Sequence, residues 1–399
     1  MESRLDKFLK GYGLTRSHND PCLYYQPKEK NMFIVAIYVD DVIACGSAED
    51  YEDFLKSITS NYKVRNLGEL KWCLGIHLIR DRKQKTISLC QEKFINELLI
   101  KFKMAKEATA RNPIEPSKKL CNAMCPNSGQ EVQKMKQYPY REIVGSILYL
   151  STCTRPDIAY ATGVVSRYMQ NPGWEHWETA KRILKYLKYT ESVKLTFDGK
   201  IPLTSVECYA DASYAEDLDK RKSTTGYTIQ MCGASVSWKS KLQPTVAKST
   251  VEAEYMALSD AAAELIWVKR ILVELEIFPK EQPITIRHDN QGSIALAYNP
   301  YASHSRVKHI DVHHHFIREA IEKEEIEVEW IPTKDMKADA LTKPFGGVKL
   351  MQSRSWLMGS GETMESEPEL ESAPRKRKSD SCGEARNNKK PKKYHPARN

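Results

Sequence analysis

The hydrophobic pattern of residues 205–345 constrains the fold most, because short strand-like runs give way there to alternating helices and strands. Runs of β-branched and aromatic residues predict strands, and apolar positions three and four residues apart predict helices. The expected strands are Val206–Tyr209, Thr224–Met231, Ala234–Trp238, Pro283–Arg287 and Glu325–Ile331. The expected helices cover residues 250–276 and 290–322, and a short one starts at Asp335. This order predicts a mixed five-stranded sheet with flanking helices.

Four acidic residues occupy suggestive places in this pattern. Asp211 follows the first strand and Asp289 follows the fourth, so their carboxylates converge at one edge of the sheet if these strands are neighbours. Glu254 lies on the long helix two residues after Glu252, and residues at this spacing point to nearly opposite faces. Only one of the two can therefore face the site. Asp339 lies in the first turn of the closing helix.

Four converging carboxylates repel one another unless cations share them, which favours two Mg²⁺ ions, with Mn²⁺ as an alternative. Two such ions can activate a water molecule and stabilise the leaving oxygen of a phosphodiester. Each acid taken singly has a structural interpretation, with Asp211 as a strand-end cap and Asp339 as a helix N-terminal acid. Their order along the chain favours the metal site.

The upstream part predicts a hairpin over Asn31–Gly46, with Asp40 and Asp41 at its tip. On spacing alone, these acids are either a charged site or an ordinary acidic β-turn. Helices are expected at residues 50–60 and 91–106, a connecting loop at 107–137, and further helices at 140–152, 156–170 and 174–188. The basic residues of the last helix are either a solvated face or a nucleic-acid contact.

Composition adds the broad class of the protein. A chain of 399 residues with 41% apolar and 28% charged residues is long enough for two or three globular domains. The net charge of +9 arises mostly from residues 374–399, which carry ten Lys or Arg and two acids. Ten cysteines in no paired framework, no secretory signal and no membrane-spanning run predict a soluble intracellular protein with reduced thiols and no membrane partner.

Several motifs resemble the RNase H domain of copia-type LTR retrotransposon Pol polyproteins. They are Tyr209–Ala212, Arg221–Tyr227, Ser237–Lys241, Ser249–Tyr255, Asp289–Ile294, Lys308–Asp311 and Ala338–Pro344. The resemblance implies cleavage of the RNA strand of RNA/DNA hybrids, with Asp211, Glu254, Asp289 and Asp339 as catalytic metal ligands. The residues expected to bind nucleic acid are Arg221, Lys222, Lys239, Lys241, Arg306, Lys308 and His309. Residues 332–337 contain no histidine, so proton transfer has no assigned residue.

The upstream half resembles the reverse transcriptase of the same family. The matching segments are Gly11–Leu14, Asp20–Tyr24, Tyr38–Asp41, Leu67–Leu70, Leu74–Ile76, Tyr140–Arg141, Val144–Leu150 and Thr154–Tyr160. The resemblance makes Asp40 and Asp41 ligands of the polymerase palm. Only 37 residues precede Tyr38, so the fingers and the first palm aspartate are expected to be missing. We therefore expect a truncated polymerase that is incompetent by itself.

These inferences give an α/β and α+β multidomain organisation. Residues 1–106 are expected to form a partial palm and thumb, 107–200 a connection region, 201–346 an RNase H-like domain, and 347–399 a disordered tail. The tail carries basic clusters that resemble a nuclear import signal, formed by Arg375, Lys376, Arg377, Lys378, Lys389, Lys390, Lys392 and Lys393. The alternative is a solvated tail that binds nucleic acid nonspecifically.

The expected partners follow from this organisation. They are RNA/DNA hybrid and other nucleic acid, an import receptor, and either a complete polymerase or particle proteins of the element, in the nucleus and the cytoplasm. A second metal motif at His309 and His313 lacks a third ligand at a suitable spacing, so a phosphate-facing role is favoured there. The alternative to a live nuclease is a catalytically inactive nucleic-acid-binding remnant or a host-recruited derivative.

Overall fold

Five strands of the C-terminal half form one mixed sheet in a computed structural model of the chain, which describes residues 4–28, 31–299 and 311–359. Their order across the sheet is β11-β10-β9-β12-β13. The bounds are β9 Val206–Ser213, β10 Thr224–Met231, β11 Ala234–Leu242, β12 Ile284–His288 and β13 Ile326–Trp330. The first three strands pair antiparallel, and β12 pairs parallel with both β9 and β13. The predicted five-stranded mixed sheet is confirmed.

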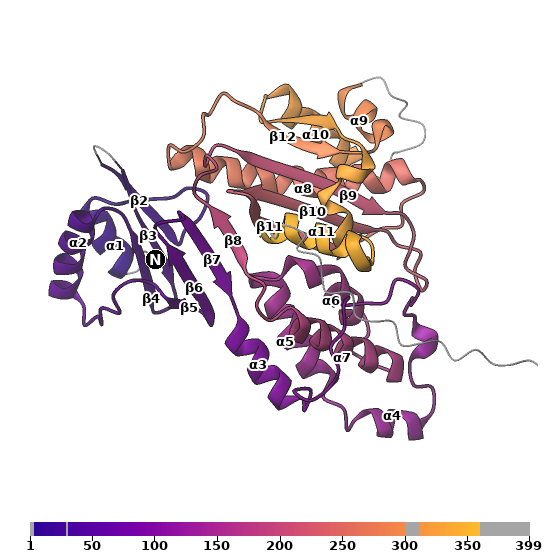
Figure 1. Cartoon of the computed structure of the whole chain (residues 1–399). Helices are drawn as coiled ribbons and strands as arrows, with labels where there is room; N and C mark the ends of the chain where they lie inside the picture. The colour runs from indigo at the N-terminus through magenta and orange to yellow at the C-terminus, as the bar shows by residue number, and fades with distance from the viewer. Residues whose placement is uncertain (1–3, 29–30, 300–310, 360–399) are drawn as a thin grey trace, which may run out of the picture. The chain divides into compact units, whose positions relative to one another are not determined.

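Helix α8 (Thr250–Glu274) lies against β9, β10 and β12 (Figure 1). Ser249 caps its N-terminus by accepting a hydrogen bond from the Glu252 amide at 3.1 Å. α8 contacts α9 (Gln291–Tyr298) and α10 (Asp311–Glu322). Fully buried Ile229, Leu258 and Ile286 belong to the apolar core between this helical layer and the sheet. This core gives the acids at the strand ends a rigid base.

Two further segments lie against this sheet. The 3-10 helix η5 (Lys337–Leu341) contacts β9 and β10, and the helix α11 (Gly347–Met358) contacts β11. The short 3-10 helix η4 (Thr333–Asp335) precedes η5. In place of the expected helix from Asp335, the structure has the 3-10 helix η5 from Lys337. The expected disorder from residue 347 is wrong as far as residue 358, because Leu350, Leu357 and Met358 on α11 are buried. The rest of the expected disordered tail, from residue 360 on, lies outside the described residues.

The N-terminal part contains a second, antiparallel sheet of order β1-β2-β3-β4. Its elements are α1 Arg4–Tyr12, β1 Thr15–Arg16, β2 Leu23–Pro27, β3 Met32–Tyr38, β4 Asp41–Cys45 and α2 Ala48–Asn61. Buried Phe33 and Val35 on β3 pack in one cluster with Leu9 of α1 and Phe54 of α2. The predicted hairpin over Asn31–Gly46 is confirmed.

A third sheet of order β5-β6-β7-β8 leads into the helical region. Its strands are β5 Trp72–Cys73, β6 Ile76–Asp81, β7 Thr86–Cys90 and β8 Leu195–Asp198. The helices are α3 Glu92–Lys101, η1 Asn122–Met124, α4 Gly129–Met135, α5 Tyr140–Cys153, η2 Pro156–Ile158, α6 Ala159–Ser166 and α7 Trp174–Tyr189. Because β7 pairs with β8, one sheet joins residues on both sides of the predicted boundary at 106. α4 interrupts the expected loop, and Ser128 caps it by accepting from the Glu131 amide at 3.2 Å.

A buried ion pair lies among these helices. Arg155 makes two hydrogen bonds to Asp157, at 2.8 and 2.7 Å, and both side chains are almost fully buried. The Tyr186 hydroxyl donates to Asp157 at 2.8 Å, and the Arg155 guanidinium also donates to Thr190. Every charge in this network is matched, as a buried ion pair requires.

The basic side chains of α7 have structural partners. Lys181 pairs with Glu178 at 2.6 Å, Arg182 pairs with Glu115 at 2.7 Å, and Lys188 donates to the carbonyl of Ala105. The interpretation as an ordinary helix face is therefore favoured over a nucleic-acid contact. None of the helices that the structure describes is long and apolar enough to span a membrane.

Candidate functional site

The site begins where two parallel strands end. The register pairs Ile286 with Cys208 and Arg287 with Tyr209, so two residues further on Asp289 lies opposite Asp211. Asp211 is 1% exposed, whereas Asp289 is half-buried. The convergence that the sequence predicted for these two acids is thus present in the structure.

Glu254 approaches the strand ends from α8. Its Oε2 accepts a hydrogen bond from the Ala212 amide at 2.9 Å, which fixes the carboxylate beside Asp211. Glu252 instead accepts from the Lys248 amide at 2.8 Å and lies outside the cluster. The two glutamates therefore have different roles. Glu252 closes the turn before the helix, and Glu254 faces the strands.

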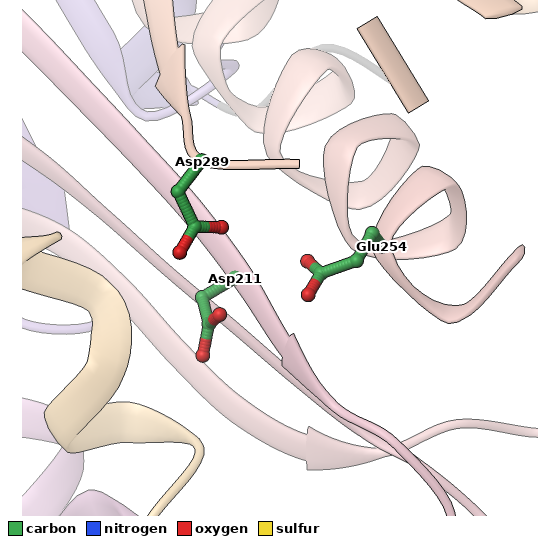
Figure 2. Close-up of side chains that lie close together, drawn as sticks. All are labelled: Asp211, Glu254 and Asp289. Carbon is green, nitrogen blue, oxygen red and sulfur yellow. The ribbon is translucent and has the colours of Figure 1, made fainter. Parts of the chain in front are cut away.

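Asp211, Glu254 and Asp289 form the cluster, and one oxygen from each carboxylate lies within 4.8 Å of the others (Figure 2). Figure 2 shows Glu254 pointing from its helix toward the two aspartates. Three carboxylates at this separation repel one another, and oxygen donors of this kind are those that Mg²⁺ and Mn²⁺ prefer. The donor set fits a divalent ion.

Asp339, the fourth expected ligand, does not belong to the three-acid cluster. Its Oδ1 lies 2.7 Å from the Lys343 Nζ, and its Oδ2 lies 3.0 Å from the Lys349 Nζ. The same Lys343 Nζ is 3.4 Å from Asp211 Oδ2, and the Thr342 hydroxyl also donates to that oxygen. In this structure two ammonium groups neutralise Asp339.

Gly226 allows the segment with Asp339 to lie close to the sheet. It faces Asp211 in the register of β10 with β9. A Cβ at position 226 would lie 2.5 Å from Thr342 Cγ2 and 2.9 Å from Leu341 Cβ, distances that real side chains avoid. The missing side chain therefore permits the contact that brings Thr342 to Asp211.

The protonation of the cluster follows from burial and crowding. Burial, together with the charges of Asp211 and Asp289, raises the pKa of Glu254 to about 9. Burial raises the pKa of Asp211 to about 6, and nearby Lys343 and Thr342 limit this rise. Without a metal ion the site therefore keeps a proton at neutral pH, and a bound cation would replace that proton.

His288 is a buried polar residue beside the cluster that the sequence analysis missed. Its Nδ1 lies 2.8 Å from the Ala210 carbonyl, so Nδ1 carries the hydrogen in the neutral ring. Its Nε2 has no hydrogen-bond partner and lies 3.8 Å from Glu254 Oε2. Burial lowers the pKa of His288, so a neutral imidazole faces Glu254. An unpaired acceptor there also fits a site that is completed by a cation or by solvent.

Asp40 lies in the exposed turn between β3 and β4, and the exposed Asp41 begins β4, with Val39 in the left-handed region at φ 53°. Within the described ranges, no third Asp, Glu, His or Cys joins them in a cluster. A β-branched residue at positive φ is strained, and such strain is common at functional turns. Their role as palm ligands stays a prediction.

The expected nucleic-acid-binding residues are only partly described. Arg221 and Lys241 are exposed, and Lys222 donates to the Pro244 carbonyl. Lys239 pairs with Asp260 at 3.0 Å, so its charge is partly neutralised. Arg306, Lys308 and His309 lie outside the described residues, as do the side chain of His313 and both basic clusters of the tail.

Lys343 lies in a motif that the sequence analysis had noted, and its position four residues after Asp339 is a signal that could have revealed the pair. Lys349 and His288 gave no such signal, because their contacts depend on how α11 and β12 pack.

Comparisons with known proteins identify the family. Residues 1–116 match the family described as "Reverse transcriptase (RNA-dependent DNA polymerase)". Over 342 residues the chain is 40% identical to the "Retrovirus-related Pol polyprotein from transposon TNT 1-94" of Nicotiana tabacum, which covers 85% of this chain and 25% of that protein. It is 34% identical over 341 residues to the corresponding polyprotein from transposon RE1 of Arabidopsis thaliana, covering 85% of this chain and 22% of that protein. The chain thus spans about a quarter of the length of these curated relatives.

A solved structure is similar to part of the chain. It is the "Crystal structure of LC11-RNase H1 in complex with RNA/DNA hybrid", which is 15% identical in sequence and covers 35% of this chain and 94% of that one. The TM-score is 0.27. At such a TM-score the likeness supports no conclusion about this chain.

Proposed function

The chain belongs to the copia-type retrotransposon Pol family, and on that premise we propose that it is a divalent-metal ribonuclease H that cleaves the RNA strand of RNA/DNA hybrids. One observation carries the proposal. Three carboxylates from two strand ends and a helix have oxygens within 4.8 Å of one another, and two of the three are buried. Such crowding is destabilising without a cation.

Asp211, Glu254 and Asp289 would hold a first Mg²⁺ or Mn²⁺ ion, and Asp339 would complete a two-ion site. Bound divalent ions would activate a water molecule and stabilise the leaving oxygen of the phosphodiester. The chain itself orients the ligands. The Ala212 amide holds the Glu254 carboxylate, and the Thr342 hydroxyl holds Asp211.

Substrate binding would depend on local positive charge, because the described part of the chain has no large basic excess of its own. The exposed residues Arg221, which precedes β10, and Lys241, which lies on β11, are available for phosphate contacts. Contacts of this type are independent of base sequence and weaken with salt. We therefore propose binding that follows the shape and charge of the hybrid.

A cleavage assay tests the proposal. A labelled RNA/DNA hybrid in Mg²⁺ should be cut by the wild type and spared by Asp289→Asn, which keeps the size of the side chain but removes the charge. Asp335→Asn is the matched control, because Asp335 is an exposed acid of η4 outside the cluster. Single-stranded RNA should be cut poorly by all three proteins.

The second candidate function is an inactive nucleic-acid-binding remnant or a host-recruited derivative. The neutralisation of Asp339 by Lys343 and Lys349 is the observation that favours it. If the wild type binds the hybrid as tightly as Asp289→Asn does and neither protein cuts it, this second function replaces the first.

For the polymerase part we propose that Asp40 and Asp41 do not support DNA synthesis by themselves, since no third described carboxylate joins them. A primer-extension assay in Mg²⁺ should then give no product above background. Robust synthesis that is lost in Asp41→Asn would overturn this proposal. A complete polymerase and particle proteins of the element are the partners that the family suggests.

A further inference from the structure

Both carboxylate oxygens of Asp339 form ion pairs with lysines. Its side chain is 3% exposed, and each carboxylate oxygen has its own ammonium partner, Lys343 on Oδ1 at 2.7 Å and Lys349 on Oδ2 at 3.0 Å. Contacts between ions at these distances are short, charge-assisted hydrogen bonds. A metal ion that binds Asp339 must therefore displace at least one of them.

Lys343 also reaches the neighbouring carboxylate. Its Nζ lies 3.4 Å from Asp211 Oδ2, so one ammonium lies between Asp211 and Asp339. A single positive charge shared by two carboxylates does part of what a bridging divalent cation does.

The opposite side of the site is different. In the part of the chain that the structure describes, neither Glu254 nor Asp289 has a lysine or arginine within salt-bridge distance. The site is thus divided into a half without an ammonium group and a half that already contains two.

The second ammonium is supplied by a folded helix. Lys349 belongs to α11, whose Leu350 packs in the apolar cluster of the helices α3 to α7 and whose Leu357 packs with Leu341 of η5. Its Nζ also lies 4.1 Å from the centre of the Phe345 ring. Packing of α11 therefore keeps the Lys349 side chain near Asp339.

We propose that Lys343 and Lys349 hold the place of the second divalent ion, so that the two ions bind in unequal steps. This inference rests on the proposed metal site. The first ion binds Asp211, Glu254 and Asp289, and the second binds only when it displaces at least one of the two lysines from Asp339. Lys343 is in this sense a positioning residue that acts through Asp211 and Asp339.

Removing either lysine should then tighten the binding of the second divalent ion. For Lys343→Met, the affinity for the second ion should rise roughly 10- to 100-fold, the range expected when one charge-assisted contact no longer competes. Lys349→Met should cause a smaller rise, because Lys349 contacts only Asp339 within the site. The first step should change little in Lys349→Met. In Lys343→Met it should also strengthen, but by less than the second step, because Lys343 lies 3.4 Å from Asp211 and 2.7 Å from Asp339.

The experiment counts Mn²⁺ bound to the full chain, using electron paramagnetic resonance to measure free Mn²⁺ and calorimetry to confirm the stoichiometry. Lys343→Arg is the charge-preserving variant and should keep the wild-type gap between the two steps. Lys334→Met is the control for net charge, since Lys334 is exposed on η4 and touches no acid of the site. Lys343→Met leaves the buried Asp211 without an ammonium partner and Asp339 with Lys349 alone, and can impair folding. Lys349→Met avoids this problem, because the Lys349 side chain is 55% exposed.

The wild type should bind Mn²⁺ in two steps of clearly different affinity. The difference between the two affinities should become smaller in Lys343→Met and Lys349→Met. Two equal steps in the wild type, or an unchanged gap in both variants, would overturn the inference and leave the proposed nuclease intact. Asp289→Asn distinguishes a failure of the proposed metal site from a failure of this inference alone. If the wild type and Asp289→Asn bind the same amount of Mn²⁺, the proposed metal site and this inference fail together.

Discussion

Binding of Mg²⁺ at pH 7 should release about one proton from the protein, because the metal-free cluster keeps one carboxyl protonated. Burial and the charges of Asp211 and Asp289 raise the pKa of Glu254 to about 9, and burial raises that of Asp211 to about 6. At pH 7 a group with a pKa of 9 is almost fully protonated, and one with a pKa of 6 is about one-tenth protonated. The two sites interact, so the proton belongs to the cluster as a whole.

Calorimetric titration measures this proton directly. Mg²⁺ is added in two buffers of different ionisation enthalpy, and the slope of the observed heat against that enthalpy gives the number of protons released. The affinity should also rise by about tenfold per pH unit between pH 7 and 8 and level off above pH 9. Asp335→Asn should behave as the wild type, because Asp335 lies outside the cluster. Heats that are equal in both buffers at pH 7 would refute the argument.

The raised pKa of Glu254 also makes the stability of the metal-free protein depend on pH. The ordinary pKa of Glu254 is 4.5, and the folded, metal-free value is about 9, so between these values the folded state holds more protons than the unfolded state. The free energy of unfolding of the metal-free protein must therefore fall as pH rises through this window, by at most about 1.4 kcal/mol per pH unit for one proton. Urea unfolding in chelator at several pH values measures the slope. Saturating Mg²⁺ should weaken it.

Three further perturbations test the packing and the tail. Gly226→Ala places a Cβ 2.5 Å from Thr342 Cγ2 and should lower the free energy of unfolding by about 1–3 kcal/mol, measured in urea. Arg155→Met leaves the buried Asp157 without its counter-charge and should cost about 3–5 kcal/mol in the same assay. Replacing the basic residues of 389–393 and 375–378 by Gln should keep a fluorescent fusion in the cytoplasm, whereas the wild-type tail should direct it to the nucleus.

Each of these has a control. Gly129→Ala adds a Cβ with nothing within 4 Å and should change stability little. Arg82→Met breaks an exposed pair with Glu69 and should cost under about 1 kcal/mol, so an equal loss in Arg155→Met would contradict the argument from burial. A wild-type fusion that stays cytoplasmic would count against the import signal.

Much of the sheet could be predicted from local pattern. The strand Thr224–Met231 was expected with the bounds that the structure has, and the long helix differs by only two residues at its end. Strand alternation and helix spacing reflect burial of one face, which each segment encodes by itself. The helix at Gly129–Met135 was missed although Ser128 and Glu131 form an N-terminal capping signal.

The sequence by itself determined where the acids lie on their elements, because strand ends and helix faces are set by residues close in the chain. It also separated Glu252 from Glu254, since helical spacing sends them to different faces. Only the tertiary structure decided the charge balance of the site. Lys349 reaches Asp339 because Leu350 and Leu357 of α11 pack against the helical region and against η5, and the unpaired Nε2 of His288 faces Glu254 because β12 lies beside β9. Contacts between elements depend on packing of the whole domain, and no local pattern records them.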